Sequence, residues 1–222
     1  RPGQVKIADL DGNGFIDPGN FAVDDHGDLR IIGNQSPRYR YGVNLSARWN
    51  GIGLSVFLQG VGARDWYPGS DAGMFWGKYG RPFFALIPSI HNYTDDMYSA
   101  ERNNWDTAYW PRMTTYQSNG TKNWTRLLEI PNTRYIQSAA YLRVKNIQLD
   151  YSFPKHICSA IRLQGLKIYV NAENLFTFTP LHKYAPNFDP EGLSYDSDFA
   201  SAADGYTYPI LKSVTVGVNI TF

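Results

Sequence analysis

The stretch DLDGNGFIDPGN, near the start of the chain, spaces oxygen-bearing residues as a calcium loop does. Calcium takes about six to eight oxygen ligands, and such a loop supplies them from alternate positions around one point. The sharp turn of the loop requires a glycine, and Gly14 occupies that position. The predicted ligands are Asp9, Asp11, Asn13, the Phe15 carbonyl, Asp17 and Asn20.

Two interpretations of this loop stay open. The last ligand position usually carries a bidentate acid, and here it carries the amide of Asn20, so the loop would bind calcium only at extracellular, millimolar concentrations. Asp24 or Asp25 could supply the missing carboxylate, but spacing alone does not decide this. Alternatively, a turn rich in glycine and aspartate needs no ion at all.

A second group of candidate residues is aromatic, because residues 65–138 hold Trp66, Trp76, Trp105, Trp110 and Trp124. Exposed rings stack on sugars or anchor a protein partner, whereas buried rings would form the core of the segment itself. Charged residues lie close to some of these rings in the sequence. We predict contact with a ligand or a lid by Trp66, Trp105, Trp110 and Arg112.

The sequence carries no catalytic signature. It lacks GxSxG, HExxH and glycine-rich phosphate-loop motifs, and its histidines are scattered. The single cysteine, Cys158, excludes an internal disulfide framework. The 21 basic and 20 acidic residues nearly balance, and no basic tract suggests nucleic acid as a partner. We therefore predict a protein that is not an enzyme and has no organic cofactor.

The elements that position these residues are strands, because apolar and polar residues alternate along several stretches. YGVNLSARW and GIGLSVFLQG form a first pair, and Asn50 and Gly51 form the tight hairpin turn between them. YLRVKNIQLDYSF and LKIYVNAENLF form a second pair, and a change of parity near Lys145 and Asn146 predicts a β-bulge. The final strand, SVTVGVNITF, alternates to the last residue, Phe222.

Short joints at one end of these strands and long segments at the other predict an all-β, antiparallel, up-and-down transmembrane barrel. No run approaches the ~20 apolar residues of a membrane helix. About five strands cannot close a barrel, and lipid does not tolerate an open edge, so we expect a fragment of a larger barrel. The expected parts are the extracellular loop 1–38, the hairpin 39–64, the extracellular loop 65–138, the hairpin 139–178, the extracellular loop 179–208 and the closing strand 209–222.

Five motifs occur in a fixed order: DLDGNGFID, IIGNQSPRYRYGVNLSARWNGIGLSVFLQGVGARD, AYLRVKNIQLDYSFP, NAENLFTFTP with FDPEG after it, and GVNITF. Together they resemble the C-terminal part of SusC-like transporters, the SusC/RagA family of TonB-dependent outer-membrane proteins. The resemblance runs from about Val5 to Phe222 and weakens in the long loops.

The resemblance implies a barrel of about 22 strands around an internal plug. It also implies a SusD-like lipoprotein lid, energy from the TonB complex, and import of glycan oligomers or peptides across the outer membrane of a Bacteroidota-type, Gram-negative cell. The plug and the segment that contacts TonB are N-terminal in that family. By the same resemblance, the last strand would carry the barrel-assembly signal at Gly217, Val218, Ile220 and Phe222.

Two other classes of protein remain as alternatives. One is a soluble, calcium-dependent, carbohydrate-binding β-sandwich whose aromatic residues form the sugar platform. The other is a passive porin or adhesin barrel without a plug. The asymmetry of loop lengths favours a barrel over the sandwich.

Overall fold

The computed structural model describes residues 5–67, 98–110, 131–186, 188–193 and 210–222. The chain divides into two compact units. One unit collects the long connecting segments 1–35, 65–137 and 181–208, and the other collects residues 36–64, 138–180 and 209–222. No helix among the described residues is long and apolar enough to cross a membrane.

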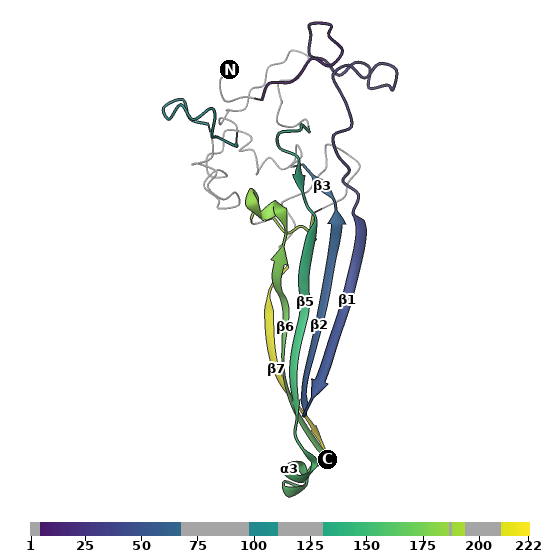
Figure 1. Ribbon diagram of the computed structural model, residues 1–222, viewed down its shortest axis with the longest axis vertical. Helices are drawn as coiled ribbons and strands as arrows, with labels where there is room; N and C mark the ends of the chain where they lie inside the picture. Colours follow the sequence, from purple (N-terminus) through teal and green to yellow (C-terminus); the bar gives the residue numbers. More distant parts are fainter. Residues whose placement is uncertain (1–4, 68–97, 111–130, 187, 194–209) are drawn as a thin grey trace. The chain divides into compact units, whose positions relative to one another are not determined.

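The second unit is one antiparallel sheet with the strand order β1-β2-β5-β6-β7, visible as a long curved ribbon in Figure 1. This arrangement confirms the predicted all-β, up-and-down antiparallel topology. Every neighbour in the sheet is therefore also the next long strand along the chain. The strands are β1 (Arg38–Trp49), β2 (Ile52–Ala63), β5 (Tyr141–Ser152), β6 (Gly165–Phe178) and β7 (Ser213–Thr221).

Short connections join the strands at one end of the sheet. Asn50 and Gly51 link β1 to β2 with positive φ angles of 47° and 86°, the backbone that a type I′ hairpin turn requires. The helix α3 (Lys155–Ala160) lies between β5 and β6. The long segments all leave from the opposite end, as the sequence predicted.

The predicted β-bulge is confirmed. The register of β5 against β6 shifts between Val144 and Asn146, and the register against β2 shifts between Phe57 and Leu58. The extra residue restores the alternation of faces after the bulge, so apolar residues of both parities along β5 reach the same side of the sheet.

The remaining elements are a two-stranded ribbon of β3 (Asp65–Trp66) and β4 (Gln137–Ser138) and the 3-10 helix η3 (Pro180–Lys183). All of their residues except Ser138 and Pro180 belong to the first unit. The core of the first unit is aromatic and aliphatic, because Trp66, Trp110 and Leu181 are almost completely buried. The described strands thus form one five-stranded sheet and one small ribbon. Two large sheets packed face to face, which the sandwich alternative requires, are not found among the described residues.

Candidate functional site

The five-stranded sheet has one continuous apolar face, whose members follow from the strand register. One row across the sheet holds Trp49, Ile52, Tyr151, Ile168 and Val218. The next rows hold leucine, isoleucine, valine and alanine, and most of these side chains are exposed, such as Val216 at 73%. In water so large an apolar surface is unfavourable, whereas a lipid environment accommodates it.

Aromatic residues gather at both ends of this apolar face. Trp49 and Phe222 are 74% and 83% exposed at the end with short connections, and Tyr41 and Phe178 are exposed at the other end. Positions 41 and 49 of β1 are separated by about 26 Å at ~3.3 Å per residue. Outer-membrane barrels have an apolar band of about 25 Å between two aromatic girdles, so the face has the dimensions of a membrane-spanning wall.

The opposite face of the same sheet is polar. Ser46, Ser55, Gln148, Asn171 and Thr215 form one row across all five strands. Side chains on this face would line the interior of a closed barrel, where water or other polar groups can satisfy them. The sheet therefore has one apolar face, which suits lipid, and one polar face, which suits an aqueous lumen.

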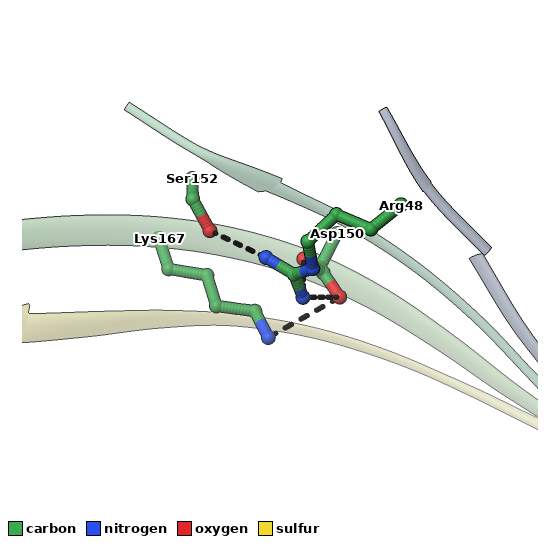
Figure 2. A network of polar contacts seen from close by, with 4 residues as sticks. All are labelled: Arg48, Asp150, Ser152 and Lys167. Atoms are coloured by element: carbon green, nitrogen blue, oxygen red, sulfur yellow. Dashed lines mark hydrogen bonds and ion pairs between the residues drawn. The ribbon is translucent and has the colours of Figure 1, made fainter. Parts of the chain in front are cut away.

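A buried carboxylate organises the polar face near the short connections. Asp150 on β5 is only 5% exposed, and it lies 3.2 Å from Arg48 Nη2 and 3.2 Å from Lys167 Nζ. Arg48 also donates a hydrogen bond to Ser152 Oγ at 3.3 Å. Figure 2 shows both cations converging on the carboxylate, which satisfies a charge that would otherwise be costly to bury.

Gly53 makes this cluster possible. Arg48 is on β1 and Asp150 is on β5, so the guanidinium must cross the intervening strand β2 at Gly53. A Cβ at position 53 would lie 2.7 Å from Asp150 Oδ1, which is closer than real Cβ contacts allow. Our sequence analysis did not identify this cluster, because alternation shows which face a residue is on but not which residues oppose it.

The predicted calcium loop folds around its own carboxylates. Asp9 accepts hydrogen bonds from the backbone N–H groups of Gly14 at 2.9 Å and Gly12 at 2.6 Å. These hydrogen bonds lower the pKa of Asp9, and the bond from Gly14 has the largest effect. Asn13 Nδ2 donates to Asp11 Oδ2 at 2.9 Å, and Phe15 N donates to Asn13 Oδ1 at 2.7 Å.

The structure brings a different set of acids together than the spacing predicted. Asp9, Asp11 and Asp28 each present a carboxylate oxygen, and these oxygens lie within 4.8 Å of one another. Asp28 is 8% exposed and accepts hydrogen bonds from Leu10 N at 2.5 Å and Asp17 N at 2.9 Å. Of the predicted ligands, Asp9 and Asp11 are part of this group, which we call the aspartate cluster.

The remaining predicted ligands have other contacts. Asp17 Oδ1 accepts a hydrogen bond from Gly19 N at 2.8 Å, and the Asn20 amide donates to Asp25. Asp28 N donates to Asp17 O at 2.9 Å, so residues 18–27 form an excursion that returns the chain to the loop. That return is why a fixed twelve-residue spacing missed Asp28.

The first unit holds a stack of aromatic rings and cations. The rings of Tyr109 and Tyr184 are parallel within 7°, with centroids 3.7 Å apart. The Arg134 guanidinium lies 5.2 Å from the centroid of Tyr109, and Lys183 Nζ lies 4.9 Å from that of Tyr184. Burial raises the pKa of Tyr109 to about 12. This stack ties residues 98–110, 131–137 and 181–186 into one core.

Burial separates the aromatic residues that we predicted to contact a ligand. Trp66 is 2% exposed and packs against Phe188 at 5.1 Å between ring centroids, and Trp110 is 1% exposed beside Tyr135. Both side chains are therefore buried in the first unit. Trp105 is 70% exposed, so its predicted contact with a ligand or a lid stays a prediction. Arg112 lies outside the described residues.

The predicted barrel-assembly residues lie on β7 and just after it. Val218, Ile220 and Phe222 are exposed on the apolar face. Gly217 faces Tyr169 of β6, and a Cβ at position 217 would lie 2.6 Å from Cε1 of that ring. Within the described chain β7 pairs only with β6, so its other edge is available to another strand.

Comparison with known proteins adds to what the apolar and polar faces of the sheet indicate. No family model matches the chain. The chain is 27% identical to TonB-dependent receptor P3 of Formosa agariphila, over 100% of this chain and 19% of that protein. It is 22% identical to TonB-dependent receptor P26 of the same organism, over 99% of this chain and 20% of that protein. The resemblance to TonB-dependent receptors is confirmed.

Solved structures support the same fold. A structure of the RagAB peptide transporter matches with a TM-score of 0.56 and 23% identity, over 88% of this chain and 18% of that chain. The RagAB peptide importer in its open-open state matches with a TM-score of 0.51 and 20% identity, over 87% of this chain and 18% of that one. The chain thus has the fold of a segment of an outer-membrane barrel, and it spans about a fifth of the length of these relatives.

Proposed function

We propose that this chain forms part of the wall and external loops of a TonB-dependent importer in the outer membrane. The observation that carries the proposal is similarity to TonB-dependent receptors along the entire chain. The two faces of the sheet support it, because one suits lipid and the other suits a polar lumen. The protein would move its substrate and would not transform it chemically.

The proposed substrates are oligomeric nutrients, either peptides or glycans. Similarity to a peptide importer supports the peptide class, and the exposed Trp105 would suit either class. The proposed partners are a SusD-like lipoprotein over the loops, the plug and remaining strands of the same transporter, the TonB complex and outer-membrane lipid.

An uptake experiment tests this proposal. Cells that carry the full-length protein would receive fluorescent pools of oligopeptides and of oligosaccharides, with and without a functional TonB gene. We expect one pool to cross the outer membrane and accumulate on its inner side only when TonB is present. Accumulation that persists without TonB would indicate a passive porin, and surface binding without accumulation would indicate an adhesin.

We also propose that the loop containing the aspartate cluster binds calcium from outside the cell. Three carboxylates converge there, and Asn13 and the Phe15 carbonyl belong to the same loop. Oxygen ligands of this kind match the preference of calcium. Asp28 would supply the acid that is missing at the last ligand position, which Asn20 occupies.

Thermal unfolding of the full-length protein during a calcium titration tests the site. We expect the melting temperature to rise at millimolar calcium, and we expect Asp11→Ala to abolish the rise. Asp24→Ala is the matched control, because Asp24 is exposed and lies outside the cluster. An unchanged melting temperature for the native protein would show that the loop is a turn without an ion.

A further inference from the structure

The connection between β5 and β6 is more ordered than a simple turn. Its helix α3 ends with Leu163 N donating to Cys158 O at 2.9 Å and Arg162 N donating to Ser159 O at 3.1 Å. These two bonds form the Schellman motif that caps many helices. The next residue is also fixed, because Gln164 N donates to Thr221 O of β7 at 2.8 Å. We call residues 155–163 the foot of the sheet.

Arg162 occupies an unusual backbone position in the foot. Its φ angle is +58°, in the left-handed region where this motif ordinarily places glycine. Any other residue there costs free energy, because its Cβ crowds the backbone. A residue held in this region is a candidate for a functional role, and the Arg162 side chain is exposed.

The foot combines exposed apolar side chains with positive charge. Ile157 lies in α3 and Ile161 is the C-cap residue of this helix, and their side chains are 40% and 53% exposed. Lys155 and Arg162 are close to them in sequence and are also exposed, and residues 153–166 contain no acid. Apolar and cationic groups together are the chemistry of segments that lie in a membrane interface.

The apolar face of the sheet leads directly into the foot. Tyr151 and Phe153 belong to that face and meet edge-to-face, with ring centroids 5.0 Å apart. Phe153 N donates a hydrogen bond to Leu166 O at 2.9 Å. The helix α3 begins two residues later, at the lower end of the sheet in Figure 1. The surface that faces lipid therefore continues toward the exposed isoleucines.

We propose that the foot binds the membrane surface at the end of the barrel that has the short connections. Ile157 and Ile161 enter the lipid, and Lys155 and Arg162 bind the phosphate groups of phospholipids. The inference rests on the proposed function, because it requires the sheet to span a membrane. Its ligand is a bilayer with anionic headgroups.

Spin labels measure the depth of the foot in the bilayer. The full-length protein, with Cys158→Ser, would carry a nitroxide at Ile157→Cys in bilayers of phosphatidylcholine and phosphatidylglycerol. Labels at Leu54→Cys on the apolar face and Arg30→Cys in the exposed N-terminal segment supply the lipid and water references. We expect the label at position 157 to collide more often with oxygen, which dissolves in lipid, than with a water-soluble nickel chelate, as the label at position 54 does.

The references separate the two ways in which this experiment can fail. A water-like label at position 157 with a lipid-like label at position 54 would overturn this inference alone. Water-like labels at both positions would overturn the membrane wall and the proposed function with it. If Cys158→Ser fails to fold, the label can be introduced with Cys158 present, because that thiol is buried.

Substitutions of Arg162 test the role of its charge. We expect the native protein to melt several degrees higher in phosphatidylglycerol nanodiscs than in phosphatidylcholine nanodiscs. Arg162→Lys should keep most of this difference. Arg162→Gly should lose at least half of it, while its melting temperature in phosphatidylcholine stays equal or rises because the backbone strain is relieved. If Arg162→Gly kept the full difference, Arg162 would have only a structural role.

Discussion

The two cations around Asp150 should contribute to stability in a strongly non-additive way. Arg48→Ala or Lys167→Ala alone leaves Asp150 with one partner at 3.2 Å. The Arg48 and Lys167 side chains are 57% and 30% exposed, so solvent weakens each pair, and each single substitution should cost about 1 kcal/mol. The double substitution leaves a carboxylate that is 5% exposed without any cation, which costs about 3–5 kcal/mol.

Adding Asp150→Asn to the double variant removes the charge that no longer has a partner. We expect this triple variant to recover most of the loss, because the free energy cost comes from burying an uncompensated charge. Guanidinium unfolding of the full-length protein in detergent micelles, followed by tryptophan fluorescence, gives the free energies of the cycle. Gln148→Ala, on the same polar face, is the control for simple truncation.

An additive result would refute this reasoning. If the double variant lost only the sum of the single losses, about 2 kcal/mol, Asp150 would be reaching water once the cations are gone. A triple variant no more stable than the double one would show that packing, and not charge, determines the loss.

Three further predictions follow from the faces and the aromatic stack. Gly217→Val should reduce the fraction of assembled barrel in the outer membrane, because the new side chain meets the Tyr169 ring, and adding Tyr169→Ala should restore assembly. Heat-modifiable gel mobility measures this fraction. Normal assembly of Gly217→Val alone would show that the ring simply moves aside. Leu54→Lys on the lipid face should cost about 2–4 kcal/mol and Ser55→Lys on the polar face far less, measured by unfolding in bilayers, and equal costs would contradict the assignment of faces. The pKa of Tyr109 is raised from 10.0 to about 12, so the folded state favours the neutral form and the first unit should lose stability as the pH rises between these values. Hydrogen exchange measured as a function of pH should show this loss of stability. Tyr109→Phe should make the loss smaller.

The sequence predicted the sheet well because its signals are local. Alternation along SVTVGVNITF, the positive-φ pair Asn50-Gly51 and the parity change near Lys145 each depend on neighbouring residues only. Strand pairing then followed from order along the chain, since each strand pairs with the next long strand. These features agree with one another, as expected for a sequence that specifies one fold.

The side-chain clusters were harder to predict because they depend on contacts between distant residues. Arg48 and Asp150 are 102 residues apart, and only the register across Gly53 brings them together. Asp28 reaches Asp9 and Asp11 through the return of residues 18–27. Composition likewise could not separate the buried Trp66 and Trp110 from the exposed Trp105.

The central claim is that one sheet separates lipid from a polar lumen, and a scan along β2 tests it most directly. Single cysteines would replace residue 52 and residues 54–58 in turn in the full-length protein with Cys158→Ser, in native outer membranes. Gly53 is left in place because a side chain there would meet Asp150. A lipid-soluble maleimide and a membrane-impermeant maleimide would then compete for each site. We expect the lipid-soluble reagent to prevail at positions 52, 54, 56 and 58 and to lose at 55 and 57. Equal access of the aqueous reagent at all six positions would contradict the account.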